Sequence, residues 1–246
     1  MFRLKYGEPG STGWGPTMRL RFNYFTPDDR YEALIADLVT DGSSWLDVGC
    51  GRDIFPFNKA LAKQLSERCG RLVGVDPAPT LAENEFVHER VHCLFDEYEA
   101  DRPYDLLTLR MVAEHVEHPE RVVAALDKAA KPGTLVVIYT VNRWSPVPLV
   151  TSLVPFSLHQ PVKRILWRTE AKDTFPTCFR MNTRKALAGQ LGASGFQEVG
   201  FWYLDDCRTF ARFRPLLFAE LSLRRVLGAV GMRYPENCLL GVYRKT

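Results

Sequence analysis

Apolar runs separated by amphipathic stretches dominate residues 44–141 and predict strands that alternate with helices. Runs that are apolar on both faces are typical of strands buried on both sides in a parallel sheet. The predicted strands are Trp45–Val48, Leu72–Val75, Val91–Leu94, Leu106–Leu109 and Leu135–Tyr139, and the clearest helices between them are Asn58–Arg68 and Pro119–Ala130. The pattern therefore indicates an α/β protein in which helices cover both faces of one sheet.

Start and stop signals frame this block. Thr26-Pro27-Asp28-Asp29 combines a capping hydroxyl, an early proline and acids near the positive end of a helix dipole. The apolar residues that give this helix one buried face are Leu34, Ile35, Leu38 and Val39. At the other end, Lys131-Pro132-Gly133 is expected to stop the last helix before a strand.

The segments after residue 141 are predicted to complete the sheet. Residues 143–182 are rich in proline and show no clear strand, so we expect an irregular insertion on the substrate side of the sheet. A helix near Thr183–Ala193 and strands at Phe196–Leu204 and Asn237–Val242 follow.

Length and composition favour one domain over residues 1–246. A chain of 246 residues that is 46% hydrophobic and 25% charged can bury one large core. The expected parts are an N-terminal arm rich in glycine and aromatic residues (1–25), a cofactor-binding core (26–142), the insertion or lid (143–182) and a C-terminal helix with strands (183–246).

Cysteine usage and the N-terminus favour a cytoplasmic protein. The six cysteines are widely spaced and never form Cys-x-x-Cys, which argues against a disulfide framework or a zinc site. Residues Met1–Pro16 have no apolar core of a signal peptide. The longest apolar stretch, Pro146–Leu158, is interrupted by three prolines and is too short to span a bilayer.

Charge is divided unevenly between the two parts of the chain. Residues 1–142 hold 16 Lys and Arg against 22 Asp and Glu, whereas residues 143–246 hold 16 against 7. The basic part is suited to an anionic substrate or membrane surface, and arginines that only solvate helix faces would give the same count. A nucleic-acid partner is not expected, because there is no dense basic stripe or RNA-binding appendage.

The run Ser44–Asp53 carries the clearest chemistry. It is a strand that ends in the turn Gly49-Cys50-Gly51, where the backbone can press against a small ligand. A second strand ends on Asp76, a carboxylate suited to ribose hydroxyls. A nicotinamide-dependent oxidoreductase is a rival hypothesis, but the third glycine of its fingerprint is missing.

The order and spacing of several segments resemble the class I S-adenosylmethionine-dependent methyltransferases. The segments are Leu46–Gly51, Val73–Asp76, Tyr104–Leu107, Glu114–Val116 and Lys131–Leu135. The resemblance covers about Thr26 to Asn142, and from Tyr104 onward it is especially close to the ubiquinone-biosynthesis O-methyltransferases. It implies a Rossmann-like three-layer αβα sandwich with a mostly parallel seven-stranded sheet. It also implies transfer of a methyl group from S-adenosyl-L-methionine to a small-molecule acceptor, with oxygen as the favoured target atom.

The resemblance assigns roles to residues that follow the strands. Gly49 and Gly51 would let the loop pass the amino-acid part of the cofactor, Asp47 would lie near its amino group, and Asp76 would bind the ribose. The full set of expected cofactor-binding residues is Asp47, Gly49, Cys50, Gly51, Asp76, Pro77, Phe95, Asp96, Arg110 and Met111. Phe95 and Asp96 would border the adenine, and Arg110 and Met111 the methionine portion.

Several of these assignments have simpler alternatives. Asp76 precedes Pro77 and could merely start a turn, and Arg110 could be a surface residue. Asp47 in a buried strand needs a polar partner in any case. Asp53 stands where the family usually has glycine, which is expected to move the start of the next helix toward Asn58.

The candidate catalytic residues are Glu114, His115 and His159. His115 is the preferred general base, because an imidazole titrates near neutral pH. Its alternative is packing against the helix that starts near Pro119. His159 lies in the insertion. His88, His92 and His118 are expected to be peripheral, and their scatter indicates no metal site. Cys178 is not a candidate nucleophile, because direct methyl transfer needs no covalent intermediate.

Polar residues after the fifth strand are candidates for acceptor binding. They are Asn142, Arg143, Arg180 and Asn182, with a loop folded back on the core as the alternative. The basic and aromatic segment 153–168 is expected to form a lid, with peripheral membrane contact as the other hypothesis. A non-catalytic scaffold that only binds the cofactor is a further alternative, and oligomeric state and acceptor identity stay open.

Overall fold

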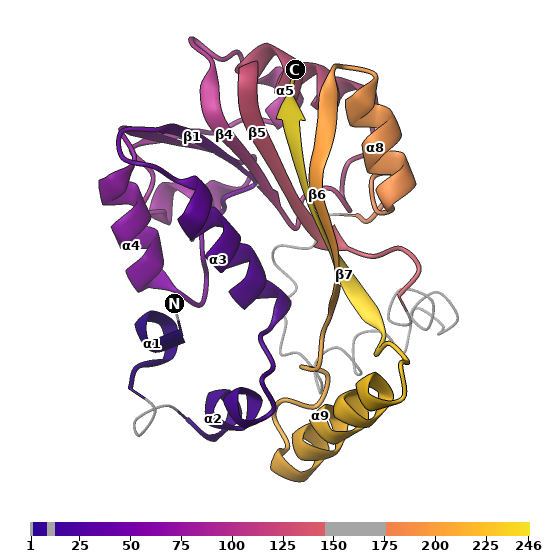
Figure 1. Ribbon diagram of the computed structural model, residues 1–246. Coiled ribbons are helices and arrows are strands. Elements are labelled where there is room, and N and C mark those ends of the chain that lie inside the picture. The colour runs from indigo at the N-terminus through magenta and orange to yellow at the C-terminus, as the bar shows by residue number, and fades with distance from the viewer. Residues whose placement is uncertain (1, 9–12, 146–175) are drawn as a thin grey trace.

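A seven-stranded sheet organises the computed structural model, which describes residues 2–8, 13–145 and 176–246 (Figure 1). The strand order is β3-β2-β1-β4-β5-β7-β6. The strands are β1 (Ser44–Val48), β2 (Arg71–Val75), β3 (Glu89–Val91), β4 (Tyr104–Arg110), β5 (Ala130–Val141), β6 (Phe196–Asp205) and β7 (Glu236–Lys245). Strands β1 to β5 pair in parallel, and β7 runs antiparallel to both of its neighbours, β5 and β6. The predicted mostly parallel sheet is confirmed.

Helices pack on both faces of this sheet. The helices are α1 (Phe2–Tyr6), α2 (Trp14–Arg21), α3 (Pro27–Leu38), α4 (Lys59–Arg68), α5 (Pro119–Ala129), α8 (Arg184–Gly192) and α9 (Arg214–Ala229), with short 3-10 turns η1 (Pro79–Glu83) and η2 (Phe95–Glu97). On β1, Trp45 packs in a core cluster with residues of α3 and α4, and the adjacent Leu46 packs with residues of α5 and α8. Alternation along buried strands thus divides the core into two apolar layers.

The N-terminal segment differs from the predicted arm because it forms two helices. Lys5 of α1 places its ammonium 2.8 Å from both Asp29 and Glu32 of α3, and the Lys5 side chain is buried. The predicted helix start on α3 is confirmed as a capping box. The Thr26 hydroxyl accepts from the Asp29 amide at 3.1 Å, and the Asp29 carboxylate accepts from the Thr26 amide at 2.9 Å.

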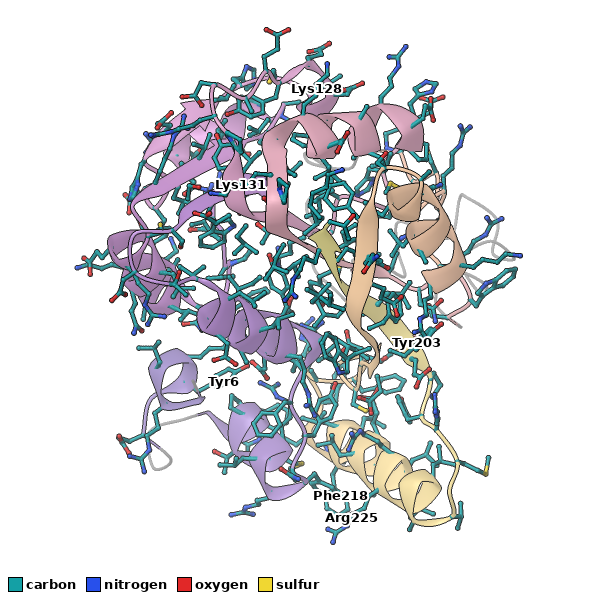
Figure 2. The ribbon with its side chains drawn as sticks, turned by 45° about the horizontal axis from the view of Figure 1, so that its top comes forward. Tyr6, Lys128, Lys131, Tyr203, Phe218 and Arg225 are labelled. Atoms are coloured by element: carbon teal, nitrogen blue, oxygen red, sulfur yellow. The ribbon has the colours of Figure 1, made fainter. Side chains whose placement is uncertain are left out.

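Helix α9 is an element that the sequence pattern did not reveal. It lies between β6 and β7 in the chain and packs with α2 over a small separate core. Tyr24, Cys207, Leu217 and Leu221 are the buried members of that core. Because its outward positions are also apolar, α9 lacks the polar face that marks a surface helix in sequence. Phe218 on α9 and Lys128 on α5 lie at opposite ends of the molecule in Figure 2.

Two predicted boundaries are wrong. The third strand covers Glu89–Val91, rather than Val91–Leu94, because its register pairs Val75 with Val91 and ends there. Lys131-Pro132-Gly133 lies inside β5, which begins at Ala130. The Lys131 amide there donates to the Thr134 hydroxyl, and a shift in register between β4 and β5 accommodates the proline and glycine.

Candidate active site

A cavity of about 490 Å³ opens at the carboxyl ends of β1, β2 and β4. This is the edge at which parallel α/β sheets bind ligands. Its lining includes seven of the residues expected from sequence to bind cofactor or to act in catalysis: Gly49, Asp76, Pro77, Phe95, Asp96, Met111 and His115. The structure therefore brings together residues that lie up to 66 positions apart in the chain.

The turn after β1 requires glycine for two physical reasons. Gly49 has a φ of 71°, in the left-handed region, and its amide donates to the Val75 carbonyl at 2.8 Å. A β-carbon at Gly49 would lie 2.2 Å from a methyl group of Val112. The loops after β1 and β4 thus touch at a point where no side chain fits. Cys50 instead points into the core, where it packs beside Gly74, so only its backbone faces this edge of the sheet.

The helix after this turn starts late, as the aspartate at position 53 suggested. Helix α4 begins at Lys59, and its N-cap Asn58 accepts from the Leu61 amide at 3.2 Å. Ile54 and Phe55 are buried in the core, which anchors the extended turn. Asp53 itself pairs with Lys59 at 3.3 Å. A third glycine is unnecessary here, because the helix does not start directly at the turn.

Asp76 is held by two backbone amides. One carboxylate oxygen accepts from the Gly51 amide at 2.8 Å and the other from the Ala78 amide at 2.7 Å. The bond to Ala78 is the turn-forming contact that the sequence offered as the simpler alternative. Asp76 also lines the cavity. Because each carboxylate oxygen has more than one lone pair, both can still accept from a ligand.

Asp47 is a buried acid with few neighbours that stabilise its negative charge. Its carboxylate accepts from the Thr108 hydroxyl at 2.5 Å, and Thr108 in turn accepts from the Trp45 indole at 2.7 Å. Burial raises the pKa of Asp47 to about 7, although the bond from Thr108 and the charge of Arg110 oppose the rise. The ionised carboxylate is therefore an attractive neighbour for a cation.

Arg110 turns away from the cavity toward the N-terminus of α3. It pairs with Asp28 at 3.4 Å, and Asp28 also binds Arg208, which follows β6. Burial by itself would raise the pKa of Asp28, but the positive charges of Arg208 and Arg110 together lower it below its usual value. Through Asp28, Arg110 is connected to α3 and to the segment that follows β6. Its contact with the methionine portion stays a prediction.

His115 lines the cavity and its orientation is fixed by backbone. Its Nδ1 lies 2.9 Å from the carbonyl oxygen of Pro176. A carbonyl only accepts, so Nδ1 carries the proton of a neutral ring and Nε2 carries the lone pair. This is the tautomer that a general base acting through Nε2 requires.

Glu114 lies behind the cavity wall. Its carboxylate accepts from the Thr140 hydroxyl at 2.7 Å, and Asn182 donates to the same hydroxyl at 2.7 Å. Its backbone carbonyl accepts from the amides of Cys178 and Phe179. Burial raises the pKa of Glu114, against the hydrogen bond from Thr140. These contacts anchor the segment 176–182, which closes one side of the cavity.

The four candidate acceptor residues lie outside the cavity lining. Asn182 is fully buried, and its amide nitrogen donates to Thr140 and to the Val141 carbonyl. Asn142 donates to the Glu236 carbonyl, Arg143 lies over the Trp144 ring, and Arg180 donates to the Glu117 carbonyl at 2.7 Å. The contacts of Asn142, Arg180 and Asn182 join distant segments of the chain, and a role of the four residues in acceptor binding stays a prediction.

Several lining residues were not identified from sequence. Apolar side chains Leu94, Val112 and Val116 form much of the wall, and single apolar residues in loops carry no signal of their own. His118 was predicted to be peripheral, but it lines the cavity. That prediction is wrong because the chain turns back toward the cavity before α5 starts at Pro119. Cys178 also contributes to the wall.

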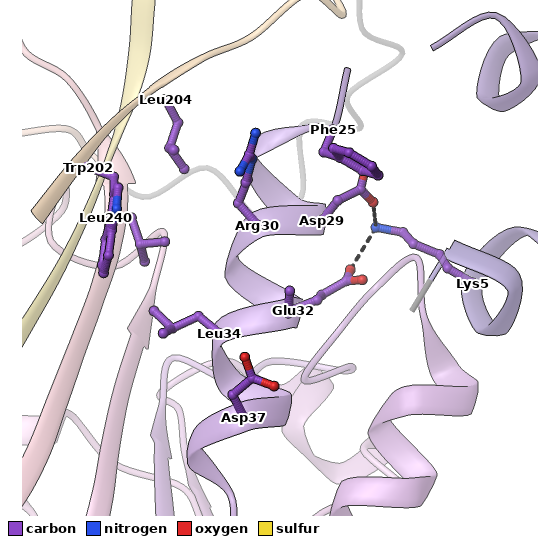
Figure 3. Close-up of a pocket in the computed structure, with 11 residues that line it drawn as sticks. Lys5, Phe25, Asp29, Arg30, Glu32, Leu34, Asp37, Trp202, Leu204 and Leu240 are labelled. Carbon is purple, nitrogen blue, oxygen red and sulfur yellow. Dashed lines mark hydrogen bonds and ion pairs between the residues drawn. The ribbon is translucent and has the colours of Figure 1, made fainter. Parts of the chain in front are cut away.

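A second cavity, of about 420 Å³, lies between α3 and the strands β6 and β7 (Figure 3). Leu34, Trp202 and Leu240 give it an apolar side, and the Lys5 ion pairs with Asp29 and Glu32 border it. None of the candidate cofactor-binding, catalytic or acceptor-binding residues lines it. It faces the side of the sheet rather than the carboxyl ends of the parallel strands.

Some expectations fall outside the described residues. His159 and the segment 153–168 are among them. Over residues 2–8, 13–145 and 176–246, no group of His, Cys, Asp or Glu side chains could hold a metal ion. In the same part of the chain, no helix combines the length and the hydropathy that crossing a membrane requires.

Comparisons with known proteins agree with this geometry. A family model described as "Methyltransferase domain" matches residues 22–199, which is more than half of the chain. The ubiquinone biosynthesis O-methyltransferase of Leptothrix cholodnii is 32% identical over 118 residues, 42% of this chain and 46% of that protein. The protein of the same name from Methylococcus capsulatus is 29% identical over 209 residues, 80% of this chain and 83% of its own length. The matches to the first three of these relatives span less than half of each relative.

Solved structures share the fold. The N-methyltransferase NodS from Bradyrhizobium japonicum WM9 has a TM-score of 0.51 at 14% identity, over 89% of this chain and 97% of that chain. At that identity the likeness concerns the fold alone. The antiparallel β7 inserted between β5 and β6 also differs from the strand order of dinucleotide-binding dehydrogenases, which weakens the nicotinamide hypothesis.

Proposed function

Because the chain belongs to the class I S-adenosylmethionine-dependent methyltransferases, we propose that it transfers a methyl group from S-adenosyl-L-methionine to a small-molecule acceptor. Binding of this cofactor is typical of the family. The single observation that carries the proposal is the juxtaposition of the Gly49 turn and Asp76 at one cavity.

The residues present fit this cofactor. Asp47 offers a buried carboxylate for the ammonium group, since an ion of opposite charge would offset its burial. Asp76 offers acceptor lone pairs to ribose hydroxyls while backbone amides hold it in place. Pro77, Leu94, Phe95 and Val116 offer an apolar slot for a flat base.

Methyl transfer requires that the acceptor be oriented toward the methyl group and that it lose one proton. The bound cofactor supplies an electrophilic methyl group on a sulfonium, and the electron pair of the breaking bond stays on sulfur. The cavity wall holds the acceptor in line with that methyl group. His115 takes the acceptor proton through Nε2, because Nδ1 is committed to the Pro176 carbonyl. Glu114 acts as a positioning residue for the wall.

The finer assignment is O-methylation of a phenolic or related acceptor. Its support is the name of the curated relatives, and general-base catalysis suits a hydroxyl whose proton must leave. A catalytic role for His159 belongs to the same proposal. Segment 153–168 is proposed to form a lid, with peripheral membrane contact as the alternative. Flotation with anionic vesicles tests that contact.

The first test is calorimetric titration with S-adenosyl-L-methionine, S-adenosylhomocysteine and NAD. We expect binding of the first two and none of NAD. Binding of NAD alone would refute the proposal. Asp76→Ala should weaken cofactor binding roughly 10- to 150-fold, as expected for loss of hydrogen bonds to a charged group. Glu83→Ala is the matched control, because Glu83 is an exposed acid that pairs with Arg52 at the surface.

Catalysis is tested with isotopically labelled methyl donor and a panel of phenols, alcohols and amines. We expect His115→Gln to lower kcat by about 10²- to 10⁴-fold with little change in cofactor affinity. His118→Gln is the comparison, since it removes the other imidazole at the cavity. Tight cofactor binding without turnover of any acceptor would favour the scaffold hypothesis instead.

A further inference from the structure

Helix α9 exposes an apolar stripe that no described part of the chain covers. Leu216, Ala219, Leu223, Val226 and Val230 follow one another at intervals of three and four residues, so they lie on one side of the helix. The large side chains of this stripe are between 45% and 65% exposed. Isolated exposed apolar residues are ordinary, but a continuous stripe of them marks an interaction surface.

The opposite side of α9 already has its partners. Leu217 and Leu221 are buried in the small core shared with α2, and Phe218 meets Phe22 edge to face with ring centroids 5.6 Å apart. Glu220 is buried and accepts from the Tyr234 hydroxyl at 3.0 Å. The helix is therefore fixed to the molecule, and the stripe is not needed to hold it there.

The charges around the stripe are of one sign. Residues 207–235 contain six arginines and one acid, the buried Glu220. Three of the arginines, Arg208, Arg224 and Arg233, pair with acids elsewhere. Arg212 and Arg225 are exposed, and none of the ion pairs among the described residues involves them. Phe218 and Arg225 lie at the end of the molecule that α9 forms in Figure 2.

This composition favours an anionic lipid surface over a second copy of the chain. Two identical faces would bring arginine against arginine with no acid between them, which is unfavourable. An interfacial helix, in contrast, combines large apolar side chains with flanking arginines that reach lipid phosphates. With 16 residues and charged positions along its length, α9 suits lying on a membrane and not crossing it.

Helix α9 and the cavity lie at the same edge of the sheet. Strand β6 runs parallel to β5, because both are antiparallel to β7. Helix α9 follows the carboxyl end of β6 and therefore lies at the same edge of the sheet as the cavity (Figure 1). A membrane at α9 would lie on the side of the molecule where the cavity opens.

We propose that the outward face of α9 docks on an anionic lipid surface, with Leu216, Leu223, Val226 and Val230 at the headgroup boundary and Arg212 and Arg225 against lipid phosphates. The contact is peripheral and reversible. It does not depend on methyl transfer, and its readout is separate from cofactor binding.

The test is co-sedimentation of the full chain with vesicles of phosphatidylcholine alone or mixed with phosphatidylglycerol. We expect binding to the anionic vesicles, weakened by salt. The double variant Leu223→Glu/Val226→Glu should bind at least about tenfold more weakly. Arg212→Gln/Arg225→Gln should lose about fivefold for each charge on anionic vesicles. Val199→Glu is the matched control, because Val199 is 49% exposed on β6, outside this face. Thermal melts verify that each variant is folded.

Three outcomes would overturn the proposal. One is absence of binding to anionic vesicles at low salt. Another is loss of binding in Lys163→Gln/Arg164→Gln/Arg168→Gln together with unchanged binding in the α9 variants, which would assign the contact to residues 153–168. The third is a dimer, measured by light scattering, that Leu223→Glu/Val226→Glu converts to monomer without any vesicle binding.

Discussion

Asp47 shows at the scale of one residue how a binding site can lower the stability of the ligand-free protein. Its carboxylate is buried with the Thr108 hydroxyl as a hydrogen-bond donor, and its pKa rises from 3.8 to about 7. A shift of this size corresponds to roughly 4 kcal/mol between the two protonation states. The folded state therefore favours the protonated form. The stabilisation is fully present below the unfolded pKa and is lost as pH rises toward 7.

Asp47→Asn should consequently separate stability from binding. At pH 8 we expect the free energy of unfolding of the ligand-free variant to exceed that of the wild type by up to about 4 kcal/mol. Denaturant titration measures the difference. Cofactor affinity of the wild type should fall about tenfold per unit as pH decreases below 7, because the ionised carboxylate is the form that attracts an ammonium. Calorimetry from pH 5 to 8 measures this slope. If the cofactor affinity of Asp47→Asn still fell steeply as pH decreases, a group other than Asp47 would be responsible for the pH dependence.

At the scale of elements, β5 supports the cavity wall through one side chain. The Thr140 hydroxyl donates to Glu114 and accepts from Asn182, so it ties the loop after β4 to the segment that precedes α8. These residues are buried, and a group left without its partner there costs about 1–3 kcal/mol. The wall that carries Pro176 and Cys178 depends on this contact.

We expect Thr140→Val to lower stability by about 1–3 kcal/mol and to raise the KM for the acceptor, because the wall loses its anchor. Thr134→Val is a matched control on the same strand. Thr134 is equally buried and donates to the Tyr104 carbonyl at 2.6 Å, far from the cavity. It should lower stability without changing KM. Equal changes of KM in both variants would show a general loss of order.

The elements that the sequence predicted well are those whose residue pattern follows from a single local property, such as burial on both faces or a helix cap. Strands β1, β2 and β4 are buried on both faces, so apolar runs alone define them, and the Thr26 capping box needs only local residues. Helix α9 was not predicted, because it has apolar residues on both its buried and its exposed side. The roles of Asn182 and Arg110 could not be derived either. Their partners, Thr140 and Asp28, are 42 and 82 positions away, and no local signal links such pairs.

At the scale of the whole molecule, the N-terminal helices are tied to the cofactor edge through buried charges. Lys5 of α1 pairs with Glu32 of α3, and Glu32 also accepts from Asn58, the N-cap of α4, at 2.8 Å. Helix α4 follows the glycine turn of the site. A segment expected to be a loose arm is thus connected to the loop that would hold the cofactor.

Lys5→Met should destabilise the protein by about 3–5 kcal/mol, because it leaves the buried carboxylates of Asp29 and Glu32 without their cation. Urea denaturation measures the change. The deficit should shrink as pH falls from 8 to 5, since protonation then neutralises the two acids. Adding Glu32→Gln to Lys5→Met should recover part of the loss. A deficit that does not vary with pH would assign it to lost packing.

Because β7 lies inside the sheet, its late position in the sequence affects the order in which the strands can pair. This strand is translated after the six others, yet it forms hydrogen bonds with β5 on one side and β6 on the other. While the ribosome is still making residues 236–245, β5 presents an unpaired edge and β6 has no place in the sheet. We therefore expect the five parallel strands to pair first, and β6 and β7 to join them together once residues 236–245 have been made.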